Sequence, residues 1–331
     1  MKFIATIFLL ILIAAASFAY LFYLPFGPHS ESFVEIAPGT SGAAIGTQLA
    51  KAGIIRSQYS FDLLRAYKSG TLKAGEYRFD HPSPLSEVYA RLLKGDVYTV
   101  TVSVPEGFNI FDIAQAVESA GLSPKDAFLA AERQHTELIS SWSPSATSLE
   151  GYLFPDTYHF SRHATPEQML TAMVRRFRQA TAQLGLTNKS PQKIAETITL
   201  ASIVEKEVSQ PDERPLVAGV FVNRLAQDIP LATDPTVIYA ALLDNRYRGT
   251  IYASDLLSGS PYNTYKHLGL PPGPICNPGV AALRAAISPA KTDYLYFVSD
   301  ANGHSRFSAT LKEHNANVLE YRKAEHAAGA R

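Results

Sequence analysis

The chain has 331 residues, of which 46% are apolar, and its 17 Phe and 17 Tyr exclude the composition of a disordered protein. Lysine plus arginine and aspartate plus glutamate both number 30, so the formal net charge is zero and no basic excess indicates a nucleic-acid-binding protein. The single cysteine, Cys276, excludes an intrachain disulfide and any cysteine-rich zinc or iron–sulfur site. This length is enough for two or three domains.

The N-terminal segment Phe3 to Leu24, FIATIFLLILIAAASFAYLFYL, contains no charged residue. A helix that crosses a bilayer needs roughly 20 apolar residues, so this segment predicts a membrane anchor. Lys2 precedes it, which predicts an N-terminus in the cytoplasm and a protein body outside. The alternative is a cleaved signal peptide, because small residues at Ser17 and Ala19 precede Tyr20. We favour the anchor because the apolar run continues past that position, and both alternatives export the rest of the chain.

A faint internal repeat follows the anchor. VEIAPGTSGAAIGTQLAKAGII starts at Val34 and aligns, at an offset of 68 residues, with VSVPEGFNIFDIAQAVESAGL, which starts at Val102. Each copy predicts a short strand, a glycine turn and a helix that ends at Gly53 or Gly121. The two copies therefore indicate small α+β modules.

The domain organisation is predicted from a change in residue composition along the chain. A strand is predicted over residues 72–79 and a helix over residues 84–95, and neither module carries a cluster of catalytic side chains. We interpret the modules as structural or glycan-gripping spacers. From Leu149 onwards, stretches rich in Pro, Gly, Asn, Asp and Tyr become dense, so we place the functional domain there. The predicted parts are an anchor at 1–27, a module at 28–98, a second small unit with a connector at 99–148 and a catalytic domain at 149–331.

The stretch LASIVEKE, residues 200–207, predicts a helix that is apolar on nearly every side and ends before Pro211. Two carboxylates, Glu205 and Glu207, close it, and a buried carboxylate is costly unless it is paired or hydrogen-bonded. In an apolar cleft the pKa of one carboxyl would rise, giving the neutral acid that glycosidic cleavage requires. Helical spacing does not choose between the two glutamates. The alternative is a structural ion pair with Lys206, Arg214 or Arg224.

A loop rich in proline and glycine, residues 262–279, cannot form a helix or a central strand. Polar groups on such a rigid loop can line a sugar cleft. Asn263 can donate and accept hydrogen bonds, Tyr265 can stack on a sugar face, and Asn277 is a further candidate.

Three carboxylates outside the glutamate helix are also candidates. Asp234 precedes Pro235, which predicts a helix cap, with substrate contact as the alternative. Glu150 and Asp156 flank the motif GYLFP and are candidates for the border of the cleft.

The sequence predicts no metal site. His304 and His314 lack the spacing of metal ligands, and we expect His314 and the adjacent Asn315 to hydrogen-bond the core. Cys276 has no evident partner that would make it a nucleophile, so we interpret it as a filler of the loop.

Several long motifs occur in a fixed order and together closely resemble the endolytic murein transglycosylase family, the MltG or YceG-like proteins. The resemblance extends over nearly the whole chain, including the anchor and a LysM-like module. The motifs are LEGYLFPDTY (149–158), ASIVEKE (201–207), VFVNRL (220–225), TDPTVIYA (233–240), YNTYKHLGLPPGPICNPG (262–279), AAISPAKTDYLYFV (285–298) and HN (314–315).

The resemblance implies an α+β enzyme, anchored in the cytoplasmic membrane, that cuts inside peptidoglycan glycan strands without a cofactor. It implies a lyase that breaks the bond between N-acetylmuramic acid and N-acetylglucosamine and leaves a 1,6-anhydro end. In that family the second glutamate of the motif is the acid and base, which is Glu207 here. Glu205 would then be a buried support, paired to Arg224. The implied partners are glycan strands and the peptidoglycan synthases of elongation or division.

Two other functions stay open at this stage. A non-enzymatic envelope scaffold that binds glycan would not need a carboxylate at Glu207. A muramidase-type hydrolase would need a second carboxylate or a positioned water, and Asp156 and Asp234 are the candidates for that role.

Overall fold

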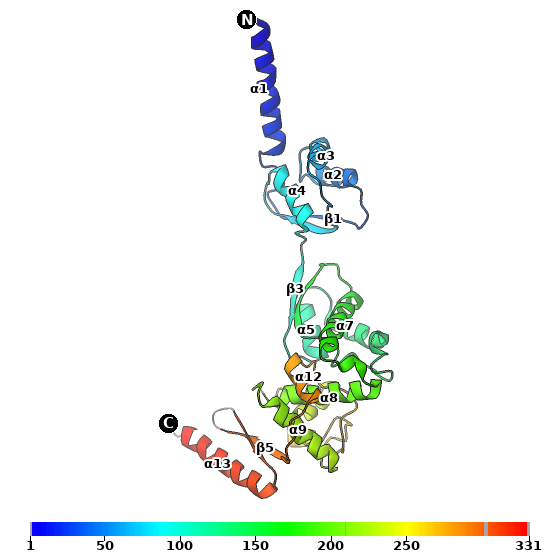
Figure 1. Cartoon of the computed structure of the whole chain (residues 1–331), viewed down its shortest axis with the longest axis vertical. Coiled ribbons are helices and arrows are strands. Elements are labelled where there is room, and N and C mark those ends of the chain that lie inside the picture. Colours follow the sequence, from blue (N-terminus) through cyan, green and yellow to red (C-terminus); the bar gives the residue numbers. More distant parts are fainter. Residues whose placement is uncertain (1, 209, 301–303, 330–331) are drawn as a thin grey trace. The chain divides into compact units, whose positions relative to one another are not determined.

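The structure is a computed structural model that describes residues 2–208, 210–300 and 304–329. Its described part is a mixture of helices and short strands, which confirms the predicted α+β class. The chain forms two compact units (Figure 1). The first contains Met1–Val100 with His159–Arg162, and the second contains Thr101–Tyr158 with His163–Arg331. Residues 101–148 therefore pack into the second unit.

The N-terminal helix α1 (Lys2–Phe22) is the one helix among the described residues that is long and apolar enough to cross a membrane. Its side chains are exposed up to the last turn, where Phe22 joins the core of the first unit. The predicted apolar helix of membrane-spanning length is confirmed.

The rest of the first unit is a two-stranded antiparallel sheet covered by three helices. Strand alternation turns Val34 and Ile36 into the core and leaves Glu35 in solvent. Val34 pairs with Tyr77, which is fully buried. The likeness of this unit to LysM modules stays a prediction. The elements are β1 (Ser32–Ile36), α2 (Gly42–Lys51), α3 (Gln58–Tyr67), β2 (Gly75–Phe79) and α4 (Leu85–Lys94).

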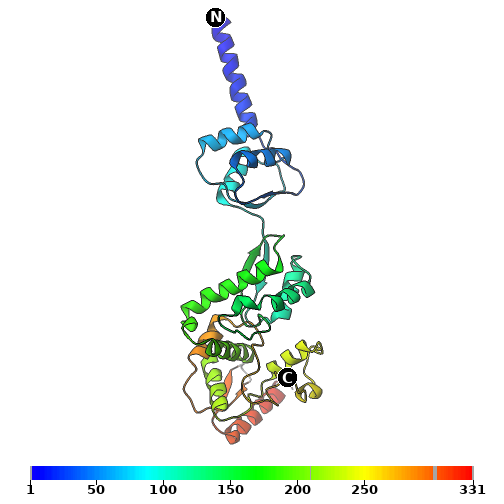
Figure 2. The same cartoon turned by 90° about the vertical axis from the view of Figure 1, so that its right-hand side faces the viewer.

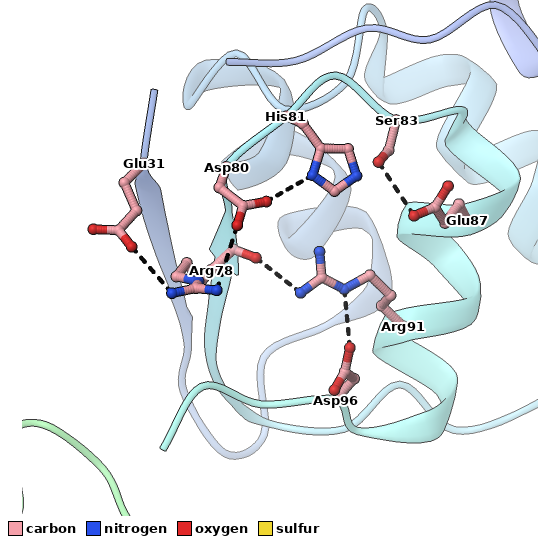
Figure 3. Close-up of polar contacts among 8 residues, drawn as sticks. All are labelled: Glu31, Arg78, Asp80, His81, Ser83, Glu87, Arg91 and Asp96. Carbon is pink, nitrogen blue, oxygen red and sulfur yellow. Dashed lines mark hydrogen bonds and ion pairs between the residues drawn. The ribbon is translucent and has the colours of Figure 1, made fainter. Parts of the chain in front are cut away.

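Charged side chains cover the surface of β1, β2 and the neighbouring α4 (Figure 3). Arg78 contacts Glu31 at 3.2 Å and Asp80 at 3.4 Å, and Arg91 contacts Asp96 at 3.2 Å. All these pairs are partly exposed, so each contributes little to stability. Their consequence is a strongly hydrated face on this side of the unit.

The second unit is mostly helical, with its strands in separate two-stranded pairs, β3 with β4 and β5 with β6. Its elements are β3 (Val100–Val104), α5 (Ile110–Ser119), α6 (Lys125–Gln134), η1 (Thr136–Ile139), β4 (Asp156–Phe160), α7 (Pro166–Gln183), η2 (Leu186–Asn188), α8 (Pro191–Glu207), α9 (Arg214–Ala226), α10 (Asp234–Leu243), α11 (Ala253–Leu256), α12 (Val280–Ile287), β5 (Tyr296–Ser299), β6 (Ser305–Ser308) and α13 (Leu311–Gly329).

The sequence repeat appears as two strand–turn–helix segments, β1 with α2 and β3 with α5. The turn glycines Gly39 and Gly107 have φ of 83° and 79°, a left-handed conformation that favours glycine. Gly53 and Gly121 follow the two helices with φ of 70° and 73°. The repeat prediction is confirmed at the level of local structure.

Helix α8 lies at the centre of the second unit and packs against α9, α10 and α12. Ser190 caps its first turn by accepting from the Lys193 N–H, and Pro191 occupies the first helical turn. From Thr197 to Val204 every residue is buried, and the helix ends at Glu207, before an extended Val208. The predicted buried helix is confirmed, and its last residue is the second glutamate of the motif.

Candidate active site

Glu207 opens into a pocket of about 300 Å³ at the C-terminal end of α8. A volume of this size lies at the lower end of the range for small-ligand sites. The wall combines apolar side chains, a cation, a carboxylate and hydroxyl groups. Its lining residues are Glu207, Phe221, Arg224, Leu231, Ala232, Thr233, Asp234, Tyr265, Phe297 and His314.

The pocket sets the protonation of Glu207. Burial, and to a smaller extent the nearby charge of Asp234, raise the pKa of this carboxyl to about 7. The Thr233 hydroxyl and the Arg224 guanidinium oppose the rise because they favour the charged form. The neutral acid and the carboxylate are therefore both accessible near neutral pH, as a group that gives and retakes a proton requires.

Glu205, only two residues earlier, faces different surroundings. Its side chain is 5% exposed, and one oxygen accepts from Arg214 Nη2 at 2.7 Å while the other accepts from the Gly279 N–H at 2.9 Å. Position 279 has no room for a side chain, because a Cβ there would lie 1.8 Å from Glu106 Oε1. Glu205 thus ties the end of α8 to the starts of α9 and α12. The expected pairing of Glu205 with Arg224 is wrong, because the partner is Arg214.

Arg224 belongs instead to the pocket of Glu207. Its Nε donates to the Leu295 carbonyl at 2.6 Å and its Nη1 donates to the Leu231 carbonyl at 2.9 Å. These bonds use two of the three guanidinium nitrogens to hold the side chain in place. The charge is then available to stabilise an anionic Glu207.

Two of the predicted binding residues, Asp234 and Tyr265, come together beside Glu207. The Tyr265 hydroxyl donates to Asp234 Oδ1 at 2.7 Å, and both residues line the pocket and are exposed. Asp234 is not the predicted cap: Thr233 is the N-cap residue of α10, and Asp234 is the first helical residue.

Thr264 fixes this pair by joining the loop to the start of α10. Its Oγ1 accepts from the Thr233 N–H at 3.1 Å and lies 2.8 Å from Thr236 Oγ1. Its carbonyl accepts from the N–H of Ala232, whose φ of 49° is unusual for a residue other than glycine. The loop and helix therefore hold the pocket wall in a defined and locally strained geometry.

Asn263 and Asn277 do not line the pocket, and both are completely buried. Asn263 Nδ2 donates to the carbonyls of Leu256 and Ser258, and its Oδ1 accepts from the Tyr265 N–H at 3.1 Å. It therefore shapes the turn that carries Tyr265.

Glu150 and Asn277 form a buried network of hydrogen bonds away from the pocket. Asn277 donates to Glu150 Oε1 at 2.9 Å, and Glu150 Oε2 accepts from the Ile110 N–H at 2.9 Å. Asn277 Oδ1 also accepts from the Leu153 N–H at 2.8 Å. Glu150 is 3% exposed, and burial raises its pKa to about 8. The structure places both residues in the core, where they connect segments far apart in sequence, and not at the predicted border of the cleft.

Asp156 also lies away from the pocket. Its carboxylate accepts from Arg176 Nε at 2.6 Å, and this hydrogen bond lowers its pKa. Of the two carboxylates considered for a hydrolase, the structure therefore places Asp234, and not Asp156, beside Glu207.

His314 is a further pocket residue whose place differs from the one predicted from the sequence. Its ring stacks on Tyr296 at 5.2 Å, and its buried Nδ1 has no hydrogen-bond partner in the described part of the chain. The expected hydrogen bond to the core is therefore wrong for its side chain. Burial and the charge of Arg224 lower its pKa, which favours the neutral ring. The HN motif marked the position, but only the packing of α13 reveals its place in the pocket.

No metal centre accompanies these groups within residues 2–208, 210–300 and 304–329, where no three His, Cys, Asp or Glu side chains gather. Cys276 is fully buried, and burial raises the pKa of its thiol well above the usual value. The pocket itself offers carboxyl, hydroxyl, guanidinium and imidazole groups.

Comparisons with known proteins extend over most of the chain. The sequence profile of the YceG-like family matches residues 34–320. A protein named endolytic murein transglycosylase from Bacillus subtilis is 34% identical over 308 residues, which cover 87% of this chain and 84% of that protein. One with the same name from Streptococcus pneumoniae serotype 2 is 32% identical over 351 residues; the match covers 95% of this chain but 64% of that longer protein.

A solved structure resembles this one as well. The crystal structure of a yceG-like protein from Listeria monocytogenes aligns with a TM-score of 0.57 and 32% sequence identity. The alignment covers 87% of this chain and 99% of that chain.

Proposed function

This chain belongs to the YceG-like family, and we propose that it is an endolytic murein transglycosylase whose acid and base is Glu207. The observation that carries the proposal is the position of this carboxyl. Glu207 is the last residue of a buried helix and lines a pocket, and the pKa of its carboxyl is raised to about 7. The substrate class comes from the activity named for the Bacillus and Streptococcus relatives.

The proposed reaction breaks the β-1,4 bond between N-acetylmuramic acid and N-acetylglucosamine within a glycan strand. Neutral Glu207 gives its proton to the glycosidic oxygen, which leaves with the N-acetylglucosamine as a 4-hydroxyl. The C6 hydroxyl of the muramic residue then attacks its own C1, and the Glu207 carboxylate takes the hydroxyl proton. The product has a 1,6-anhydro end, no water is consumed, and Glu207 returns to its starting state.

The surroundings of Glu207 support this double role. Arg224 stabilises the carboxylate that exists between the two proton transfers, whereas burial and Asp234 favour the neutral acid that starts the reaction. Thr233, Asp234, Tyr265 and His314 offer hydrogen-bonding groups that can orient sugar hydroxyl and acetamido groups.

One observation favours a second candidate, a muramidase-type hydrolase. Asp234 is an exposed carboxylate in the same pocket as Glu207, so the site contains the second carboxylate that activation of a water would need. The hydrogen bond from Tyr265 occupies one oxygen of Asp234, which leaves the other oxygen for a water.

Product analysis separates the two chemistries. Purified glycan strands incubated with the full-length enzyme should give fragments whose muramic ends are lighter by one water than reducing ends, as mass spectrometry measures. The enzyme should cut bonds inside the strands and should release no single disaccharides. Reducing ends in place of anhydro ends would assign the hydrolase.

The location and partners of the enzyme belong to the same proposal. Helix α1 anchors the chain with its N-terminus in the cytoplasm, and the second unit works outside the membrane on nascent strands. The first unit, as a LysM-like module, holds glycan, and peptidoglycan synthases supply the strands that are cut.

A further inference from the structure

The first unit exposes an apolar stripe on α3. Tyr59, Leu63 and Tyr67 are 77%, 59% and 86% exposed and follow one another at intervals of four residues, so they share one face of the helix. The opposite face, with Phe61 and Leu64, packs into the core. A single exposed apolar side chain is ordinary, but a row of three large ones along a helix indicates a surface that something covers.

This stripe lies beside the end of the apolar helix α1. A largely apolar pocket of about 460 Å³ lies between the end of α1 and α3. It is lined by Phe18, Phe22, Tyr23, Leu63, Leu64 and Tyr67, together with Lys68 and Ser86. Figure 2 shows α3 at the foot of α1, running across its direction. Apolar side chains at the end of α1 and on α3 therefore line one common pocket.

Contacts with the rest of the first unit hold the end of α1 in place beside α3. Arg56 donates to the carbonyls of Leu24 and Pro25 at 2.7 and 3.0 Å. Its guanidinium also lies over the rings of Tyr20 and Phe26, at 4.3 and 4.8 Å. Phe22 is only 6% exposed.

We propose that α3 lies in the lipid–water interface, with Tyr59, Leu63 and Tyr67 inserted at the level of the phospholipid headgroups. The proposal goes beyond cleavage of glycan and depends only on α1 crossing the bilayer. If α1 runs along the bilayer normal, a helix across its foot is parallel to the membrane surface.

The chemistry of the stripe fits this occupant. Tyrosine is enriched at membrane interfaces because its ring is apolar and its hydroxyl is polar. Arg65 and Lys68 are exposed on and just after α3, where anionic headgroups would attract them. The charged surface of β1 and β2 lies at the end of the unit farther from α1, so the unit would turn its hydrated side away from the lipid (Figure 1).

Depth measurements on the full-length protein test the proposal. Leu63→Cys, and Glu35→Cys on β1 as the matched control, each carry an environment-sensitive fluorophore; Cys276 is fully buried and stays unlabelled. The proteins are placed in vesicles of phosphatidylethanolamine and phosphatidylglycerol that contain lipids with a quencher at the headgroup or at the chain end. The label at position 63 should shift to the blue and lose fluorescence, more to the headgroup quencher than to the chain-end quencher. The label at position 35 should do neither.

A second variant links the depth to the stripe. Tyr59→Ser combined with Tyr67→Ser should reduce the quenching at position 63 and leave the melting temperature unchanged, because both side chains are exposed. Equal, low quenching at positions 63 and 35 would overturn the proposal. So would a blue shift at position 63 that appears only at high ratios of protein to lipid, because a second copy would then be the occupant.

Discussion

Glu205 and Glu207 are two residues apart at the end of α8, yet their carboxylates have opposite surroundings. Glu205 makes an ion pair with Arg214 and accepts from a backbone N–H, whereas Glu207 lines a pocket. The difference arises because Arg214 at the start of α9 and Gly279 before α12 bind the Glu205 carboxylate, whereas the Glu207 carboxylate faces the pocket. The two residues therefore form a natural pair for substitution.

Substitution of the inner glutamate should act on stability. Glu205→Gln leaves Arg214 buried with a weakened partner, and breaking one partner of a buried pair costs about 3–5 kcal/mol. Urea denaturation should show a lower free energy of unfolding, while the rate per folded molecule changes much less. A variant of full stability that releases no product would show instead that Glu205 takes part in the chemistry.

The raised pKa of Glu207 predicts the pH dependence of the reaction. Only neutral Glu207 can donate the first proton, so kcat/KM should fall by about tenfold per pH unit above pH about 7. A profile of initial rates between pH 5 and 9 measures it. Rates that stay constant up to pH 9 would contradict the assignment.

The raised pKa of Glu207 also makes the free energy of unfolding depend on pH. The folded pKa of Glu207 is higher than its usual value of 4.5, so its contribution is fully present below pH about 4.5 and is lost as the pH rises through about 7. Glu150, with a pKa of about 8, acts in the same direction. Urea midpoints should therefore decrease between pH 5 and 8.

At the scale of elements, the loop of residues 262–279 shapes the pocket through buried polar side chains. Asn263→Ala would leave the carbonyls of Leu256 and Ser258 and the N–H of Tyr265 without this partner, at a cost of about 1–3 kcal/mol. We expect a lower melting temperature and a slower reaction, because Tyr265 loses its position. Unchanged stability with a large rise in KM would show that Asn263 contacts the sugar itself.

Local signals predicted some of the elements, among them α1, β1 with α2, β3 with α5, and α8. The apolar run that ends before Pro211 indicated α8, and the glycines at equivalent places indicated both copies of the repeat. The assignment of individual side chains was harder, because it depends on contacts between distant segments. Asn277 meets Glu150 across 127 positions, and no local pattern shows that their bond is internal.

Some pocket residues could not be found from the sequence for the same reason. His314 and Phe297 reach the pocket only because α13 packs on the β5–β6 pair and β5 packs against α9. The choice between Glu205 and Glu207 came from the family resemblance, since the helical period places both at the end of one buried helix. In the structure an ion pair with Arg214 occupies Glu205, which is the physical argument for proposing Glu207 as the acid and base.

At the scale of the whole molecule, α1 should keep the enzyme in the membrane. The full-length chain should stay in the membrane pellet after alkaline carbonate extraction. High pH weakens electrostatic contacts at the membrane surface, but it does not extract an apolar helix of this length from the bilayer. A variant that starts at Pro28 should appear in the supernatant. A mature chain that begins at Tyr20 in a membrane-free fraction would show that the segment is a cleaved signal peptide.

The most direct test of the account is Glu207→Gln, compared with wild type and with Glu205→Gln. Glutamine keeps the size of the side chain and removes the transferable proton, and loss of a general acid costs about 10²–10⁴-fold in rate. Release of anhydro-muropeptides from purified peptidoglycan should fall by at least that factor, while the melting temperature stays close to that of wild type. Near-normal release by Glu207→Gln, with a folded but inactive Glu205→Gln, would contradict the account and reverse the roles of the two glutamates.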